Sequence, residues 1–181
     1  LGVTELPRLV LLNPNTGDLV PLRRWPEERY VEVAHRLLAA HPDVAILLTG
    51  APAEAPAAEA LAARIGSTRC TSVAGATTMR ELLVLYHLSE ILVTNDSGPA
   101  HYGSLAPIDV VALFGPETPA VFGPVGVRST TLWAGIPCSP CVNAYNNRLS
   151  PCHDNVCMQR ITVDQVVDVV EQRLADRPAR G

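Results

Sequence analysis

The 181-residue sequence has no cluster of basic residues and no long uninterrupted run of apolar residues. Its formal net charge is −4, and without a basic stripe it lacks the usual surface for binding nucleic acid. A membrane-spanning helix needs about 18 consecutive apolar residues, and no segment reaches that length. Hydrophobic residues make up 48% of the chain and charged residues 18%, which excludes a disordered protein. We therefore expect one globular domain over residues 1–181.

Other features are missing as well. No signal peptide is visible, but the chain begins with Leu1 rather than Met, so this absence says little about targeting. The turn after the first predicted strand lacks the glycine triplet that a dinucleotide-dependent dehydrogenase needs, which disfavours that class of enzyme. There is also no clear Asp-x-Asp pair of the kind that would hold a metal–diphosphate.

Short apolar runs alternate with segments of helical periodicity along the chain. The runs predict strands at residues 9–12, 44–48, 70–73, 90–94, 109–114 and 130–133. The helical patterns predict helices at residues 25–41, 55–65, 79–88 and 99–105, and a closing helix at about 163–174. A Cys-, Pro- and Asn-rich loop is expected over residues 135–160. This alternation predicts an α/β fold with a mostly parallel sheet covered by helices on both faces.

The most informative motif is the polar turn that follows the strand at residues 90–94. Asp96 and Ser97 are favoured helix N-cap residues, Gly98 permits close approach, and Pro99 suits the first helical turn. A helix start of this kind offers free N–H groups and a partial positive charge to a phosphate. The turn also fits an ordinary helix cap. His101, one turn into the helix, would either bond a phosphate or lock the turn.

Similar polar turns follow three other predicted strands, at residues 13–17, 49–52 and 115–118. The carboxyl ends of parallel strands lie along one edge of a sheet, so these turns and the Asp96 turn should converge on one crevice. That convergence favours a small-molecule site over a set of unrelated caps.

In this order, the motifs resemble those of glycosyltransferase family 9, the ADP-heptose:lipopolysaccharide heptosyltransferases and their relatives. The matching blocks are Asn13-Pro14 through Arg23-Arg24-Trp25-Pro26, Thr49-Gly50-Ala51-Pro52, Gly75 with Thr77, Asp96-Ser97-Gly98-Pro99 with His101, and Leu113-Phe114-Gly115-Pro116. The resemblance implies the C-terminal, Rossmann-like half of a GT-B enzyme, which binds the nucleotide-sugar donor. It also implies an inverting, metal-independent transfer of a heptose to the lipopolysaccharide core or a related lipid-linked glycan, without a cofactor.

The resemblance implies a role for each of the motif residues. It assigns the donor diphosphate to Asn15, Thr16, Arg23 and the amides of Ser97 and Gly98. It assigns the ribose to Glu54, the base pocket to Thr77 and the sugar hydroxyls to Asp96. Arg23 departs from the family, which usually has Lys there, and its planar fork contacts phosphate differently.

The catalytic base of the family lies in an N-terminal acceptor domain that this chain lacks. We therefore expect donor binding without transfer by this chain alone, in a cytoplasmic protein that is also compatible with a peripheral place at the inner membrane. Two alternatives stay open: a transferase that uses a UDP- or GDP-sugar, and a non-catalytic nucleotide-binding module.

Four cysteines occur in the loop at residues 135–160. Cys138 and Cys141 have a spacing common in zinc sites, whereas Cys152 and Cys157 are spaced more loosely. Structural zinc, packed free thiols and disulfides all remain open, although a cytosolic location disfavours disulfides.

Overall fold

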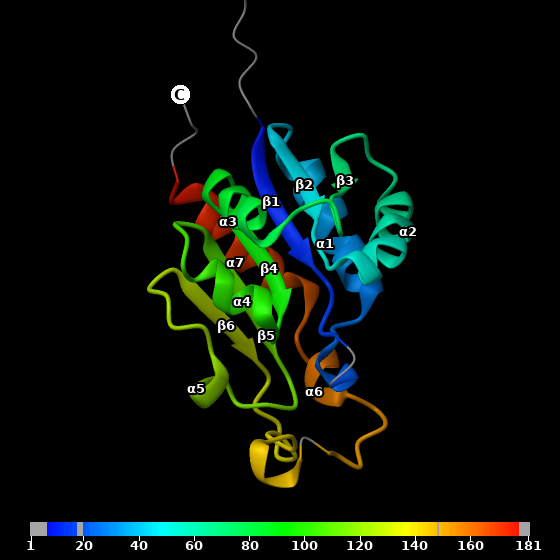
Figure 1. Ribbon diagram of the computed structural model, residues 1–181, viewed down its shortest axis with the longest axis vertical. Helices are drawn as coiled ribbons and strands as arrows, with labels where there is room; N and C mark the ends of the chain where they lie inside the picture. The colour runs from blue at the N-terminus through cyan, green and yellow to red at the C-terminus, as the bar shows by residue number, and fades with distance from the viewer. Residues whose placement is uncertain (1–6, 18–19, 148, 178–181) are drawn as a thin grey trace, which may run out of the picture.

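The computed structural model describes residues 7–17, 20–147 and 149–177. These residues form a six-stranded sheet in which every neighbouring pair is parallel, in the order β3-β2-β1-β4-β5-β6 (Figure 1). The strands are β1 (Arg8–Asn13), β2 (Val44–Leu48), β3 (Cys70–Ser72), β4 (Ile91–Asn95), β5 (Asp109–Phe114) and β6 (Ser129–Trp133). The sequence prediction of a parallel α/β fold is therefore confirmed.

Helices cover both faces of the sheet. The α-helices are α1 (Glu27–Ala40), α2 (Ala55–Ile65), α3 (Met79–Leu88), α4 (Gly98–Gly103), α5 (Pro119–Phe122), α6 (Val156–Gln159) and α7 (Val163–Ala175). The 3-10 turns are η1 (Pro21–Arg23), η2 (Pro52–Glu54) and η3 (Ala144–Asn146). Figure 1 shows α3 and α4 in front of the sheet, with α1 and α7 behind it.

The apolar core is divided by the sheet into two clusters. The larger one joins α1, α2 and α7 to the sheet through residues such as Tyr30, Leu61 and Val166. The smaller one packs α3 and α4 on the other face through Tyr86 and Ala100. β4 and β5 are buried along their whole length, which explains why they read as continuous apolar runs in the sequence.

Local signals account for most of the helix boundaries. The Thr78 and Thr162 side chains each accept a hydrogen bond from the backbone N–H three residues later, so both helices begin where the sequence predicts. Gly66 ends α2 in the left-handed conformation (φ 64°), which glycine adopts without steric cost. The predicted bounds of β2, α2, α3 and β5 agree with the structure to the residue.

Some predicted bounds were wrong. β4 runs from Ile91 to Asn95, one residue later than predicted, and α4 begins at Gly98 and ends at Gly103. The loop at 135–160 contains the short elements η3 and α6. Elements of one turn have no apolar period to reveal them. Here local capping by Asn143 and the burial of Met158 hold them in place.

The order of the strands creates a switch point between β1 and β4. From β1 the chain proceeds to β2 on one side, whereas from β4 it proceeds to β5 on the other. The crossover helices then lie on opposite faces and leave a crevice at the carboxyl ends of these strands, where open α/β sheets bind ligands.

Buried polar side chains fix the loops around this crevice. Asn13 Nδ2 donates to the carbonyl and hydroxyl oxygens of Thr49, both at 3.1 Å. Asn95 Nδ2 donates to the Pro14 carbonyl at 2.7 Å, and its Oδ1 accepts from the Trp25 amide at 3.1 Å. The strand ends therefore hold the turns through satisfied hydrogen bonds rather than through apolar packing.

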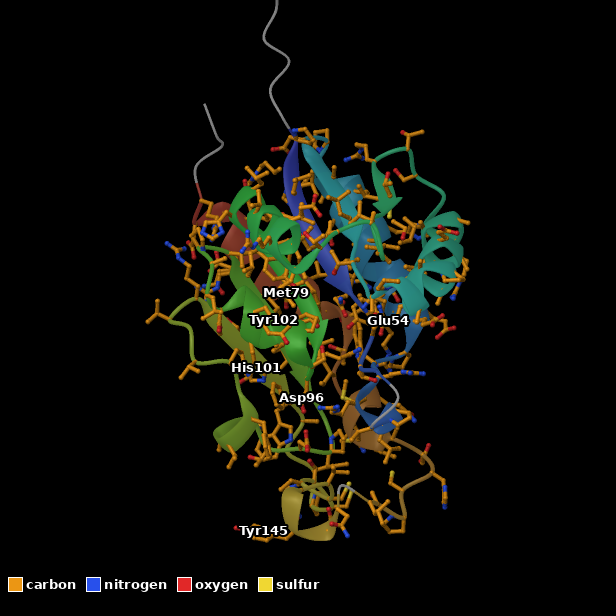
Figure 2. All side chains as sticks on the ribbon, viewed as in Figure 1. Glu54, Met79, Asp96, His101, Tyr102 and Tyr145 are labelled. Atoms are coloured by element: carbon orange, nitrogen blue, oxygen red, sulfur yellow. The ribbon has the colours of Figure 1, made fainter. Side chains whose placement is uncertain are left out.

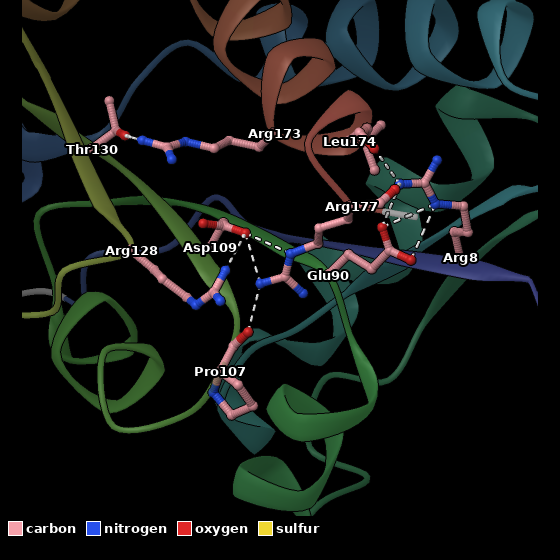
Figure 3. A network of polar contacts seen from close by, with 9 residues as sticks. All are labelled: Arg8, Glu90, Pro107, Asp109, Arg128, Thr130, Arg173, Leu174 and Arg177. Carbon is pink, nitrogen blue, oxygen red and sulfur yellow. Dashed lines mark hydrogen bonds and ion pairs between the residues drawn. The ribbon is translucent and has the colours of Figure 1, made fainter. Parts of the chain in front are cut away.

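The amino ends of the strands carry a separate ionic network, shown in Figure 3. Arg8 pairs with Glu90 through its Nε and Nη2 atoms, with a shortest distance of 2.7 Å, and donates to the Leu174 carbonyl at 2.6 Å. Arg177 donates to Asp109 at 2.6 Å. These bonds tie the end of α7 to the sheet. Among the described residues, no helix is long and apolar enough to cross a membrane.

Candidate functional site

A cavity of about 350 Å³ opens at the carboxyl edge of the sheet. It is bounded by the turns after β1, β2 and β3 and by the starts of α3 and α4. The residues that line it are Asn13, Asn15, Thr16, Gly17, Thr49, Gly50, Ala51, Pro52, Glu54, Thr77, Thr78, Met79, Leu82, Ser97, Gly98, Pro99 and Tyr102. The predicted convergence of the turns is thus observed for the segments that follow β1, β2 and β4.

One wall of the cavity is formed where the backbone of the turn after β2 approaches neighbouring side chains closely. Glu54 Oε2 accepts a hydrogen bond from the Ala51 amide at 2.7 Å, which fixes the turn after β2. A Cβ atom on Gly50 would lie 2.8 Å from Asn15 Nδ2 and 3.1 Å from Glu54 Oε2. Only glycine at position 50 therefore allows both polar side chains to keep their places.

The opposite wall is more apolar. Figure 2 shows Met79 and Tyr102 on one side of the site and Glu54 on the other. Met79 and Tyr102 are 51% and 40% exposed. A sulfur-containing chain and an aromatic ring give this wall a surface on which a flat ring can pack.

Below this cavity, three charged side chains from different elements are buried together. Arg23 Nη1 lies 3.4 Å from Glu117 Oε2 and 3.7 Å from Asp96 Oδ2. The pKa of the Asp96 carboxyl is raised to about 7, first by burial and then by the Glu117 carboxyl, against the opposing charge of Arg23. Arg23 Nε and Asp96 Oδ2 are buried and make no hydrogen bond within the described residues. Buried polar atoms without such bonds are rare and often mark a ligand site.

The structure separates the nine predicted site residues into three groups. Six line the cavity: Asn15, Thr16, Glu54, Thr77, Ser97 and Gly98. Arg23 and Asp96 lie in the buried charge cluster instead, and His101 is exposed on α4. Since no ligand is present, the role of each residue stays a prediction.

The turn after β4 differs from the expected cap. Ser97 is the N-cap of α4, but its side chain makes no capping hydrogen bond. Its hydroxyl donates instead to the Asn95 carbonyl at 3.2 Å, which holds it against the strand. Asp96 does not cap the helix, because its carboxyl turns into the charge cluster.

Several residues of the site were not predicted from the sequence. Asn13 and Thr49 lie at strand ends, and their polarity after an apolar run is a signal that could have revealed them. Tyr102 has no such signal, because a single aromatic residue on a short helix reads as core. Glu117 belongs to the predicted turn at 115–118, and this turn reaches the site through the contact of Glu117 with Arg23.

The cysteine-rich loop forms a second cavity, of about 290 Å³, far along the chain from the first. Cys138, Cys141, Cys152 and Cys157 all line it, and all four are free thiols. Within the described ranges, no three His, Cys, Asp or Glu side chains stand close enough to hold a metal ion. Structural zinc in this loop stays a prediction.

The strand order and the place of the cavity are those of a Rossmann-like domain. The sequence model of glycosyltransferase family 9 (heptosyltransferase) matches residues 5–151. The chain therefore belongs to glycosyltransferase family 9, as its motifs predict.

Curated relatives agree with this membership. The lipopolysaccharide heptosyltransferase 2 of Salmonella typhimurium is 28% identical over 119 residues, which cover 64% of this chain and 34% of the relative. The lipooligosaccharide heptosyltransferase 2 of Haemophilus ducreyi is 28% identical over 139 residues, or 73% of this chain and 38% of the relative. The matches thus span little more than a third of the length of these relatives.

Solved structures share the fold. The Escherichia coli ADP-heptose lipopolysaccharide heptosyltransferase II superposes with a TM-score of 0.76 at 21% identity, covering 94% of this chain and 47% of that protein. A family 9 glycosyltransferase from Veillonella parvula gives a TM-score of 0.74 at 23% identity, covering 98% of this chain and 48% of that protein. The chain therefore matches about half of each of these proteins.

Proposed function

We propose that this chain is the donor-binding, C-terminal half of a heptosyltransferase-like glycosyltransferase that uses an ADP-heptose-like nucleotide-sugar. The observation that carries the proposal is the cavity at the switch point between β1 and β4, where Rossmann-like sheets bind nucleotides. Membership of family 9 and the names of the relatives, one of which was solved with ADP, favour an ADP-sugar.

Each part of the cavity suits one part of such a donor. The Asn15 and Thr16 side chains and the Ser97–Gly98 amides would meet the diphosphate, with Arg23 as the cation behind them. The Glu54 carboxylate would accept hydrogen bonds from the ribose hydroxyls, at the wall opposite Met79. The base would pack between Thr77 and the apolar wall, and Asp96 would face the sugar.

This arrangement supports an inverting displacement that needs no metal ion. Negative charge grows on the bridging oxygen of the nucleoside diphosphate as the glycosidic bond breaks. A fixed N–H donor aimed at that oxygen typically lowers the barrier by about 3–4 kcal/mol. The acceptor, lipopolysaccharide core or a related lipid-linked glycan, and the catalytic base would belong to an N-terminal domain. The enzyme would act in the cytoplasm, at the surface of the inner membrane.

A UDP- or GDP-sugar donor and a non-catalytic nucleotide-binding module are the competing proposals. Calorimetric titration of the protein with ADP, UDP and GDP, and then with their nucleotide-sugars, separates all three. Selective binding of ADP, strengthened by an attached heptose, supports the proposed donor. Preference for UDP or GDP would mean that the donor is a UDP- or GDP-sugar instead. Equal binding of the free nucleotide and the nucleotide-sugar favours a module that does not use the sugar.

A further inference from the structure

The guanidinium of Arg23 is buried, but its ion pairs are long. Its Nη1 atom lies 3.4 Å from Glu117 Oε2 and 3.7 Å from Asp96 Oδ2, whereas charge-assisted hydrogen bonds are typically about 2.7–2.9 Å long. Its Nε atom is buried and makes no hydrogen bond to a described residue. Because these contacts are weak, the backbone that carries Arg23 has a large share in fixing where the cation lies.

That backbone is held from two sides by asparagine side chains. From the end of β4, Asn95 Oδ1 accepts a hydrogen bond from the Trp25 amide at 3.1 Å. From the cysteine-rich loop, Asn155 Nδ2 donates to the Arg24 carbonyl at 3.0 Å. The Arg24 carbonyl and the Trp25 amide belong to the same peptide group. Since a peptide group is planar, the two bonds together fix its orientation directly after Arg23.

Asn155 is turned toward this peptide group by its own backbone. It has the left-handed conformation (φ 53°, ψ 35°), which asparagine tolerates better than most residues. Its amide donates to Cys152 Sγ at 3.3 Å. Asn155 is also the N-cap of α6, where an asparagine side chain usually accepts a bond from the helix, but here it makes no capping hydrogen bond. Its Nδ2 instead bonds a carbonyl 131 positions away.

The short helix α6 has other anchors besides the Asn155 side chain. Met158 in this helix is fully buried in the larger apolar cluster. Just after the helix, the Ile161 carbonyl accepts a hydrogen bond from Trp25 Nε1 at 2.9 Å. These contacts hold α6 against the sheet and against the start of α1. Loss of the Asn155 side chain should therefore free the Arg24 carbonyl without displacing the helix.

We propose that Asn155 is a positioning residue of the donor site, which holds the Arg24–Trp25 peptide group so that the Arg23 guanidinium lies where the donor diphosphate binds. This inference rests on the proposed function. It gives the cysteine-rich loop a part in donor binding, although none of the loop's described residues lines the cavity.

The first test is ADP binding by Asn155→Gly, measured by calorimetry. Glycine keeps the left-handed backbone and removes only the amide side chain. We expect the Kd for ADP to rise about fivefold, as for the loss of one hydrogen bond. Adenosine lacks the diphosphate, so its Kd should stay within about twofold of the native value. An equal loss for ADP and adenosine would indicate general damage to the site and would contradict a role through Arg23.

A double-mutant cycle tests whether Asn155 acts through Arg23. When Arg23 is already replaced, in Arg23→Ala, adding Asn155→Gly should raise the Kd for ADP by less than about twofold. If the two substitutions instead multiply their separate effects, Asn155 acts independently of the cation and the proposal fails.

Two further variants control the change at position 155. Asn147 lies in the same loop, is exposed and has the same left-handed φ of 53°. Asn147→Gly therefore makes the same chemical change in the same backbone conformation, and the Kd for ADP should remain native. Asn155→Asp keeps the shape of the side chain but has no N–H to donate to the Arg24 carbonyl. It should weaken ADP at least as much as Asn155→Gly, and native affinity in Asn155→Asp would contradict the proposal.

NMR of the Arg23 Nε–H group reads the position of the cation without any nucleotide. The signal is assigned by its loss in Arg23→Ala; it should shift in Asn155→Gly and stay in place in Asn147→Gly. An unchanged signal together with native ADP affinity in Asn155→Gly would overturn the role of Asn155 and leave the proposed function standing. No binding of ADP by the native protein would overturn the proposed function and, with it, this inference.

Discussion

Two ionic clusters lie at opposite ends of the same sheet, and they are built differently. At the amino end, Arg8 and Arg177 meet Glu90 and Asp109 at 2.6–3.1 Å, and carbonyl oxygens accept further hydrogen bonds from both arginines (Figure 3). At the carboxyl end, Arg23 meets Asp96 and Glu117 only at 3.7 and 3.4 Å. In the first cluster, each carboxylate is paired with an arginine at hydrogen-bond distance. The second has longer ion-pair distances and buried atoms that make no hydrogen bond to a described residue, as expected where a ligand completes the structure.

The largest effect should come from breaking the complete cluster. Glu90→Ala leaves Arg8 partly buried without its paired carboxylate, so we expect the free energy of unfolding to fall by about 3 kcal/mol or more. Denaturant unfolding measures this. Nucleotide affinity should stay at the native value, because Glu90 lies at the far end of the strand. Glu32→Ala, which removes an exposed partner of Arg36, is the matched control and should change the stability little.

The second largest effect should come from the charge cluster at the carboxyl end. Asp96→Ala should lower donor use by about a hundredfold or more in a protein that also contains the acceptor domain, because the sugar loses a buried acceptor. The free energy of unfolding should change by less than about 1 kcal/mol, because the lost carboxyl is poorly satisfied. Sugar transfer and denaturant unfolding are measured on the same preparation. Unchanged turnover would remove Asp96 from the sugar site.

A smaller effect should follow from removing Arg23, the cation of this cluster. Arg23→Ala should weaken ADP and the ADP-sugar alike, by about tenfold, because both carry the diphosphate. Calorimetric titration with both ligands checks this, with Arg36→Ala as an arginine control away from the cavity. If only the intact nucleotide-sugar lost affinity, Arg23 would be a sugar contact and its assignment to the diphosphate would be wrong.

The smallest effect concerns stability and pH. The pKa of Asp96 is raised to about 7 in the folded chain, above its unfolded value near 3.9. Between these values the folded state holds a proton that the unfolded state releases. The contribution to stability is therefore full below about pH 4 and is lost as the pH rises to about 7. Relative to Asp96→Asn, the native protein should lose about 1 kcal/mol between pH 6 and 7, measured by thermal unfolding. An equal pH dependence in both proteins would contradict the shifted pKa.

The parts of the molecule also differ in how well the sequence predicts them. The strands and most helices follow from apolar periodicity and from capping residues such as Thr78 and Thr162. The turns of the cavity follow from polar residues at strand ends, because parallel topology brings those ends together. Both kinds of signal are local in the sequence.

The charge cluster has no local signal. Arg23, Asp96 and Glu117 are separated by 73 and 21 positions, and no local pattern indicates that their side chains meet. Their meeting depends on the order in which the strands assemble, which one sequence does not reveal. The same reason explains why Tyr102 was missed and why Arg23 was expected in open contact with a phosphate rather than in a buried ion cluster.

The most direct test of a donor site at the carboxyl end of the sheet is to follow the amide chemical shifts of the labelled protein while ADP is added. We expect the shifts to concentrate in residues 13–17, 49–54, 77–79 and 97–102, while the amino-end residues Arg8, Glu90, Asp109 and Arg177 stay unperturbed. Shifts centred on the amino end, or spread evenly over the chain, would contradict a donor site at the carboxyl ends of the strands.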